Sequence, residues 1–189
     1  MLVRMAAGDL YRADDPELVE LSLRAMDLTE AYNRTSARDG ERRRALLVEL
    51  LADVGEGTDI RPPLRVDYGR HISIGSRTFV NFGLVALDVA AITIGDDVQI
   101  GSNVQLLTPM HPLPADARRD KWESAEPIRI GDNAWLGSGV IVLPGVEIGT
   151  NTVVGAGSVV IRDLPAGVLA TGNPARVVRD LPGDQTAGR

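Results

Sequence analysis

The chain of 189 residues is 44% hydrophobic but only 4% aromatic, so it can form one domain whose core is built from aliphatic side chains. Its formal net charge of −6 argues against nucleic acid as the main partner, because phosphate binding needs a basic surface. The absence of cysteine excludes disulfides, thiolate-bound metals and a cysteine nucleophile.

Neither a signal peptide nor a membrane span is expected. Residues 1–15 contain no continuous apolar stretch like that of a signal peptide, and no segment approaches the ~18 apolar residues of a transmembrane helix. We therefore expect a cytoplasmic protein without a membrane partner.

Residues 14–56 predict two helices, within an N-terminal helical segment that spans residues 1–58. Asp15 is suited to the N-cap of the first helix, with Pro16 at the first helical position. The second helix is expected over residues 36–55, with Gly55 as its C-terminal cap and the arginines of "ERRR" on a solvated face. One apolar face of the first helix is formed by Leu18, Leu21, Leu23, Met26 and Leu28.

An aliphatic residue recurs every six residues through most of the remaining chain, and a glycine often follows it. The main series is Ile94, Ile100, Leu106, then Ile130, Leu136, Val142, Ile148, Val154 and Val160. A second series stands two residues earlier: Ile92, Val98, Val104, then Ile128, Ala134, Val140 and Val146.

A six-residue period indicates short strands joined by tight corners. Three such strands per coil form a triangular prism whose stacked coils pair their strands in parallel. A β-sandwich would not keep so strict a period. We expect a parallel β-helix over residues 59–165, interrupted by a loop at about 107–127. The C-terminal segment, 166–189, is expected to hold turns, one short strand and about eight disordered terminal residues.

His111 stands where the repeat gives way to the loop, and it is one of only two histidines. An imidazole is the side chain best suited to take a proton from a hydroxyl near neutral pH, so His111 is the strongest catalytic candidate. We interpret the other histidine, His71, as structural or simply exposed. Two histidines and no cysteine cannot form a three-histidine zinc site within one subunit, and no metal is expected. The glycine-rich "GAGSVV" lies inside the repeat and lacks the helix of a nucleotide-binding loop.

Several segments together carry a family resemblance. In chain order they are "AGDLYRADDPEL", "RPPLRVDYGRHISIG", "FVNFGLVALD", "MHPL", "PIRIGDNAWLGSGVIVLPGVEIG", "VVGAGSVVIRDLP" and "GNPARVVR". With these segments the chain resembles the maltose and galactoside O-acetyltransferase family of hexapeptide-repeat acyltransferases, over roughly residues 5–180. The resemblance implies a left-handed β-helix, whereas the usual crossover rule would suggest a right-handed one. It also implies a homotrimer with active sites between subunits.

The reaction implied by this resemblance is direct acetyl transfer from acetyl-CoA to a sugar hydroxyl, without an acetyl-enzyme. His111 would act as general base. Asn81 and the backbone N–H of Ser138 would stabilise the oxyanion or hold the acceptor. Glu123 would orient His111 or the acceptor. A serine nucleophile is not excluded by composition.

Three aspartates are implied as acceptor-binding residues together with Asn81: Asp14, Asp67 and Asp88. Each departs from the family pattern. The family has a small polar residue at the position of Asp67. The counterpart of Asp14 could be Asp15 or even Ala13, and Asp88 stands one place before a family carboxylate, where this chain has Val89.

The coenzyme site implied by the resemblance is a groove between subunits. Trp135, next to an inward Leu136, should face outward and pack on the pantetheine arm. Ser138, Ala156 and Ile161 would line the groove through backbone groups. The phosphates would be bound by Arg162, Arg176 and Arg179.

Two alternatives stay open. The acceptor could be an antibiotic, a lipo-oligosaccharide or an amino-sugar. A non-catalytic hexapeptide-repeat scaffold would instead show weak binding of coenzyme A, and its loop histidine would be degenerate.

Overall fold

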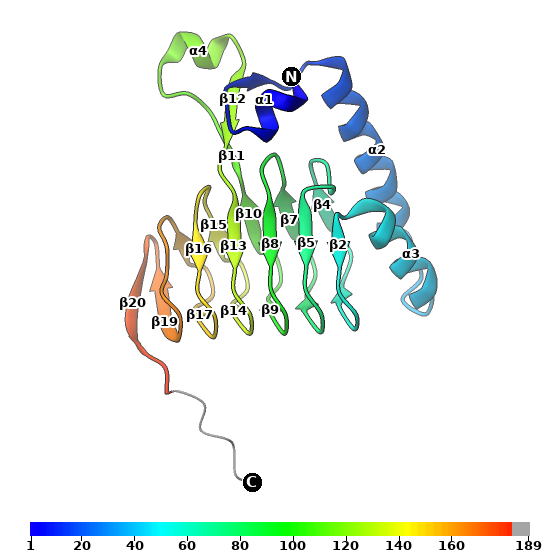
Figure 1. Cartoon of the computed structure of the whole chain (residues 1–189). Coiled ribbons are helices and arrows are strands. Elements are labelled where there is room, and N and C mark those ends of the chain that lie inside the picture. The colour runs from blue at the N-terminus through cyan, green and yellow to red at the C-terminus, as the bar shows by residue number, and fades with distance from the viewer. Residues whose placement is uncertain (183–189) are drawn as a thin grey trace.

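Three parallel β-sheets form the walls of a prism in the computed structural model, which describes residues 1–182 (Figure 1). Successive strands pass from one sheet to the next, and each strand pairs in parallel with its equivalent in the following coil, as β5 does with β8. The predicted architecture, a mainly β parallel β-helix preceded by a helical segment, is confirmed.

The strands of the three walls are short. The first wall contains β2 (Asp53–Val54), β5 (Ile72–Ile74), β8 (Ile92–Ile94), β13 (Ile128–Ile130) and β16 (Glu147–Ile148). The second contains β3 (Asp59–Ile60), β6 (Phe79–Val80), β9 (Gln99–Ile100), β14 (Trp135–Leu136), β17 (Val153–Val154), β19 (Val168–Gly172) and β20 (Ala175–Asp180). The third contains β4 (Leu64–Val66), β7 (Leu84–Leu87), β10 (Gln105–Leu107), β15 (Ile141–Val142) and β18 (Val159–Val160).

Both predicted series of aliphatic residues point into the prism and are buried. Hydroxyl side chains take the place of an aliphatic residue at some interior positions, and each donates a hydrogen bond to a backbone carbonyl. Thr78 Oγ1 donates to Gly95 O, and Ser158 Oγ donates to Gly155 O. Satisfied hydroxyls cost the interior little, so the core keeps its regular stacking.

The corners of the prism require glycine because successive coils stack backbone on backbone. A Cβ atom placed on Gly101 would lie 2.5 Å from the backbone nitrogen of Ser138. A Cβ atom on Gly137 would lie 2.5 Å from the backbone nitrogen of Ala156. The glycines of the repeat therefore serve close approach between coils.

Three helices precede the prism: α1 (Leu2–Ala6), α2 (Pro16–Asn33) and α3 (Gly40–Leu50). The Asp15 carboxylate accepts a hydrogen bond from the N–H of Glu17 at 3.2 Å, which confirms the predicted N-cap. The predicted apolar face is only partly correct. Leu18 is buried, but Leu23 and Met26 are 52% and 59% exposed. The buried face of α2 is formed by Leu18, Ala25, Thr29 and Tyr32.

The prediction for the second helix is wrong at both ends. Its N-cap is Asp39, whose carboxylate accepts from the N–H of Arg42, and it ends at Leu50. Gly55 is a corner of the first coil, where its N–H donates to Ile74 O. The β-helix therefore begins at β2 rather than at residue 59.

The arginines of α3 are not a solvated face, because two of them bind backbone carbonyls of the first coil. Arg43 donates to Ile60 O at 3.0 Å, and Arg44 donates to Gly55 O at 2.8 Å. Figure 1 shows α2 and α3 alongside this end of the prism, beside β2.

The chain continues the prism after Val160. Leu164 forms a bridge with Ile148, and β19 pairs with β17 in parallel. β20 then pairs with β19 in the antiparallel direction, so the segment has two strands where one was predicted. The expected terminal disorder concerns residues that lie, apart from the first, outside the described range. No helix within residues 1–182 is long and apolar enough to cross a membrane.

The long loop is more regular than predicted. β11 (Pro109–Met110) and β12 (Trp122–Ala125) form an antiparallel ladder, with α4 (Ala115–Arg119) at the tip between them. β1 (Tyr11–Arg12), from the N-terminal segment, pairs with the other edge of β12. Figure 1 shows this unit projecting beyond the prism, with α1 beside β12.

Candidate active site

A cavity of about 380 Å³ lies beside His111, between the loop, the start of α2 and the first coils. Its titratable side chains include His111, Glu123 and Asp67, all of them predicted site residues. The structure therefore brings together one imidazole and two carboxylates, groups that can accept protons and hydrogen bonds from hydroxyls.

Tyr11 is a cavity residue that the sequence reasoning did not single out. Its ring is buried, and its hydroxyl donates a 2.8 Å hydrogen bond to Glu123 Oε2. Burial and the hydrogen bond to Glu123 raise the pKa of Tyr11 above its ordinary value, so the phenol stays protonated and remains the donor. The quoted segment "AGDLYRADDPEL" contains Tyr11, but nothing in it reveals that its partner lies 112 residues away.

Asp67 lies half-buried in the cavity, in the turn that follows β4. Burial raises its pKa to about 6, with further contributions from the negative charges of Asp88 and Glu123. The same acidic surroundings and burial raise the pKa of Tyr68 to about 12. Asp67 thus lines the cavity with His111, and its role in acceptor binding stays a prediction.

Asp88 has a different position from the one predicted. Its side chain is 0% exposed, and it accepts hydrogen bonds from the backbone N–H groups of Asp67, Tyr68 and His71 at 3.1, 2.9 and 3.2 Å. A carboxylate without exposed surface cannot contact a dissolved acceptor, so this prediction is corrected. Asp88 instead fixes the turn that carries Asp67. The His71 ring bonds to the carbonyl of Asp88 at 2.7 Å, which makes this histidine structural.

Asp14 does not line the cavity, in contrast to its predicted role in acceptor binding. Its carboxylate is exposed and pairs with the guanidinium of Arg12, outside the cavity. The neighbouring Ala13 lines the cavity instead. Val89, which stands at the position of the family carboxylate, is a cavity residue as well.

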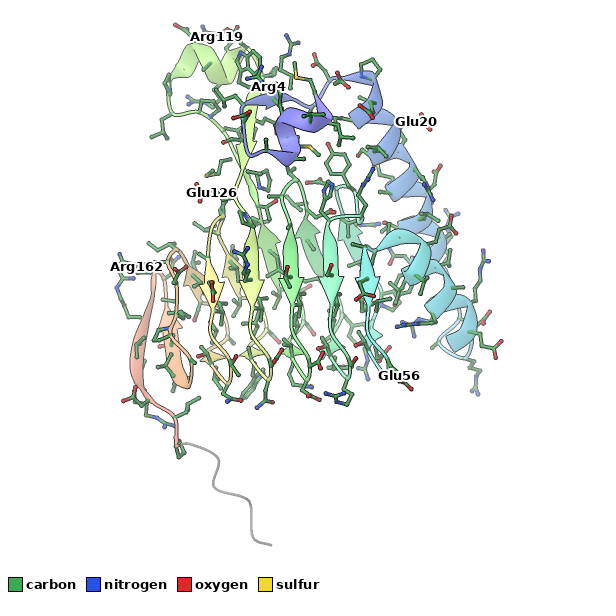
Figure 2. All side chains as sticks on the ribbon, in the orientation of Figure 1. Arg4, Glu20, Glu56, Arg119, Glu126 and Arg162 are labelled. Atoms are coloured by element: carbon green, nitrogen blue, oxygen red, sulfur yellow. The ribbon has the colours of Figure 1, made fainter. Side chains whose placement is uncertain are left out.

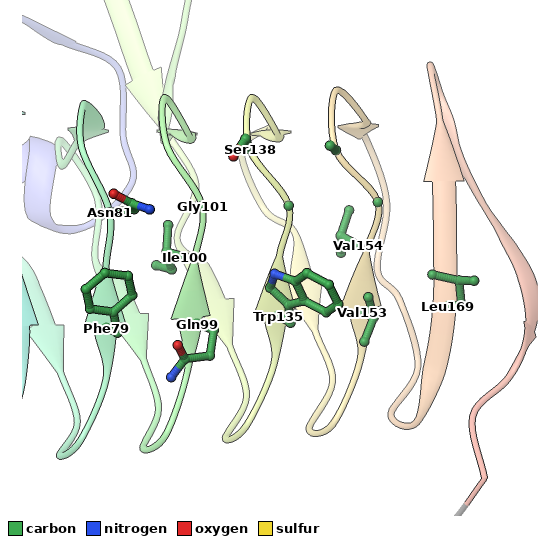
Figure 3. A pocket seen from close by; sticks show the side chains of 13 residues that line it. Phe79, Asn81, Gln99, Ile100, Gly101, Trp135, Ser138, Val153, Val154 and Leu169 are labelled. Atoms are coloured by element: carbon green, nitrogen blue, oxygen red, sulfur yellow. The ribbon is translucent and has the colours of Figure 1, made fainter.

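A second hollow, of about 580 Å³, runs along the second wall of the prism (Figure 3). Trp135 faces outward there with 54% of its surface exposed, as its position beside the inward Leu136 predicted. Asn81, Ser138 and Ala156 line the same groove. Within one chain, Asn81 and Ser138 thus belong to a different hollow from His111.

The groove contains a backbone N–H without a protein partner. At the same corner one coil earlier, the N–H of Ser102 donates to Ser138 Oγ at 3.2 Å. The residue stacked after Ser138 is Ala156, which has no side-chain oxygen. No acceptor within residues 1–182 pairs with the N–H of Ser138. This donor is available to a ligand.

The predicted phosphate-binding residues lie at the C-terminal end of the prism. Ile161 and Arg162 are exposed after β18, and Figure 2 shows Arg162 at that end. Arg176 and Arg179 lie on β20, where Arg179 is opposite Leu169, a residue of the groove. Among the described residues, none of these three arginines forms an ion pair.

The described residues contain no group of three or more histidine or carboxylate side chains that could hold a metal ion.

Comparison with known proteins identifies the relatives of this chain. Residues 4–55 match the maltose acetyltransferase hexapeptide capping motif, and residues 127–162 match the bacterial transferase hexapeptide model of six repeats. The galactoside O-acetyltransferase of Escherichia coli is 40% identical, over 96% of this chain and 89% of that protein.

Two solved structures share the architecture. The maltose O-acetyltransferase of Clostridium difficile 630 superposes with a TM-score of 0.95 at 40% identity, covering 96% of this chain and 97% of that one. A galactoside acetyltransferase in complex with coenzyme A gives a TM-score of 0.93 at 40% identity, covering 96% and 91%. The chain therefore belongs to the maltose and galactoside O-acetyltransferase family of hexapeptide-repeat acyltransferases.

Proposed function

We propose that this protein transfers the acetyl group of acetyl-CoA to a hydroxyl of a sugar-like acceptor, with His111 as the general base. The observation that carries the proposal is the cavity in which the imidazole of His111 lies with the carboxylates of Asp67 and Glu123. Relatives named galactoside and maltose O-acetyltransferases support the acceptor class. A cytoplasmic location remains a prediction.

In the proposed reaction, the imidazole of His111 takes the proton of the acceptor hydroxyl as its oxygen attacks the thioester carbonyl. The new C–O bond gives a tetrahedral oxyanion, for which the free N–H of Ser138 and the side chain of Asn81 supply hydrogen-bond donors. The C–S bond then breaks, and the thiolate of coenzyme A takes the proton from the imidazolium. The products are the acetyl ester and free coenzyme A, and no acetyl-enzyme is formed.

The groove on the second wall is the proposed donor site. Trp135 offers an exposed indole face to the apolar part of the pantetheine arm. Ser138 and Ala156 line the groove and would offer backbone groups, whereas Ile161 is exposed outside the lining and would contact coenzyme A there. Arg162, Arg176 and Arg179 would pair with the phosphates of coenzyme A. A solved relative that binds coenzyme A supports this assignment.

The two hollows require a second subunit if they act together. His111 projects on the loop beyond the prism, whereas Asn81 and Ser138 lie on its wall. We therefore propose a homotrimer in which the loop of one subunit covers the groove of its neighbour. The apolar side chains along this wall include the exposed Trp135 and the partly buried Phe79, and they suit a face that a second subunit covers.

The proposed function is tested by mixing the protein with acetyl-CoA, a thiol-detecting reagent and a panel of maltose, glucose, galactosides and amino-sugars. We expect release of coenzyme A that depends on an acceptor, and a loss of roughly 10²–10⁴-fold in His111→Ala. His71→Asn is the matched control, because it removes the other imidazole and retains a donor for the Asp88 carbonyl.

The outcomes separate the remaining alternatives. Activity with an amino-sugar or antibiotic alone would move the acceptor to that class. Binding of acetyl-CoA without any transfer would leave the donor site but overturn the acceptor. Absence of acetyl-CoA binding would overturn the transferase and favour a scaffold.

A further inference from the structure

Three residues from distant parts of the chain are aligned across the antiparallel sheet that supports the loop. Tyr11 of β1 is directly opposite Glu123 of β12. On the other edge of β12, Pro109 is opposite Ala125 and Met110 is opposite Ser124. Continuing that register by one residue places His111 opposite Glu123.

Residues directly opposite each other in an antiparallel pair point to the same face, with Cβ atoms about 5 Å apart. Glu123 thus occupies the middle position between Tyr11 and His111, and all three residues line the same cavity. In this extended register, the carboxylate that accepts from the Tyr11 phenol would have the His111 imidazole on its other side.

The hydroxyl of Tyr11 has no other recorded partner within residues 1–182 than Glu123 Oε2. The Tyr11 ring is 1% exposed and packs with Met5, Leu18 and Ala125. A phenylalanine could fill this space equally well, so the hydroxyl has a role that ring packing does not require. Holding one oxygen of Glu123 limits the rotation of the carboxylate and leaves the second oxygen for the cavity.

We propose that Tyr11 is a positioning residue for acetyl transfer, whose hydroxyl holds Glu123 in the orientation in which that carboxylate orients the imidazole of His111. The inference rests on the proposed function for its catalytic consequence, but the contact and its effect on the histidine ring do not depend on it. It also gives the N-terminal segment a part in the chemistry, since β1 delivers this hydroxyl.

The test compares Tyr11→Phe with Tyr32→Phe. Tyr32 is a matched control, because it is also 1% exposed and its hydroxyl also donates a hydrogen bond, to Ile60 O at the far end of α2. We expect kcat to fall roughly 10- to 100-fold in Tyr11→Phe, the scale of a misplaced catalytic group, with the KM for acetyl-CoA unchanged. Tyr32→Phe should lose thermal stability but keep kcat within about twofold.

Two further measurements distinguish a positioning role of Tyr11 from a purely structural role. In a Glu123→Gln background, Tyr11→Phe should change kcat by less than about twofold, because both changes remove the same orientation. The chain has only two histidines, so NMR can follow the ring of His111 against that of His71. The His111 ring signals should move in Tyr11→Phe and in Glu123→Gln, and stay in place in Tyr32→Phe.

The proposal is overturned if Tyr11→Phe keeps full kcat, if its effect multiplies with that of Glu123→Gln, or if the His111 ring signals do not respond. If the wild-type protein transfers no acetyl group to any acceptor, the proposed function fails, and the NMR comparison still decides whether the Tyr11 hydroxyl orients the histidine.

Discussion

The wall that carries Trp135 and the loop that carries His111 are built from different kinds of contact. In the wall, backbone N–H groups donate to carbonyl groups one coil away, as Trp135 N does to Thr152 O. In the loop, β12 is also supported by a segment more than a hundred residues away in the chain, through the Tyr11–Glu123 hydrogen bond. The wall carries the groove proposed for acetyl-CoA and is built by one repeated contact, whereas the loop carries His111 and interrupts the repeat.

In the proposed reaction, the binding of acetyl-CoA and the transfer of the proton are therefore divided between the regular wall and the irregular loop. The free N–H of Ser138 arises from the regular system, where Ala156 replaces a side-chain acceptor. The His111 cavity arises where the regular system is interrupted. Variants in the wall should therefore affect stability and acetyl-CoA binding, and variants in the loop should affect turnover.

The largest effect is expected from a change that separates the coils of the wall. Gly137→Ala places a Cβ atom 2.5 Å from the backbone nitrogen of Ala156, so two coils must move apart. We expect a loss of about 3 kcal/mol in the free energy of unfolding, measured by denaturant titration. Gly40→Ala is the control, because an added Cβ there meets nothing within 4 Å. Equal stability of the two variants would contradict the close stacking of the coils.

A smaller effect is expected on ligand binding alone. Trp135→Ala removes an exposed indole from the groove, so acetyl-CoA should bind about 10- to 100-fold more weakly with little change in thermal stability. Isothermal titration calorimetry measures the affinity, and sedimentation reports whether the oligomer persists. Val48→Ala, an exposed apolar residue of α3 outside this groove, should bind normally. Unchanged affinity in Trp135→Ala would move the donor site away from this groove.

The smallest effect is expected from removing the ionisable carboxyl group of Asp67 from the cavity. Burial beside Asp88 and Glu123 raises the pKa of Asp67 to about 6, so its ionised form costs the folded state free energy. This cost is absent below the pKa of the unfolded chain, grows as the pH rises through that range, and is complete above about pH 6.

Two pKa units correspond to at most about 3 kcal/mol, and relaxation and solvent screening of this partly exposed group reduce the effect. Asp67→Asn should therefore stabilise the protein by about 1 kcal/mol at pH 8 and by only a few tenths of a kcal/mol at pH 4. The same change should raise the KM for the acceptor and leave that for acetyl-CoA unchanged. Asp53→Asn, an exposed carboxylate of β2, is the control for a general charge effect. A stabilisation that is the same at both pH values would show that burial and the neighbouring carboxylates do not raise the pKa of Asp67.

The sequence predicted the wall well because its contacts repeat. A six-residue period is enough to place Leu136 inside and Trp135 outside, since each coil imposes the same alternation on the next. The second helix was misjudged because Gly55 resembles a helix cap when its role as a corner of the first coil is unknown. Here the long-range pairing of β2 with β5 prevailed over the local signal.

The candidate site was predicted less completely, for a related reason. From the sequence, Asp88 was expected to be an exposed carboxylate. In the fold it accepts hydrogen bonds from three backbone N–H groups of the preceding coil, which the local sequence does not indicate. Tyr11 reads as an ordinary apolar residue until β1 is paired with β12. His111 was singled out as a candidate because it is one of two histidines and stands where the repeat is interrupted. The residues that lie near it in space have no comparable signal in the sequence.

A stack of parallel coils has no natural length, since each coil exposes backbone groups on which another could be laid. In the described residues, both ends of the prism are capped. Arg43 and Arg44 occupy carbonyls of the first coil, and β20 runs antiparallel with Arg176, Arg179 and Asp180 exposed along it. Charged edges discourage strand addition from other molecules. Without these two capped ends, the exposed backbone of the end coils could pair with coils of other molecules, and the regular repeat would be a template for fibre growth.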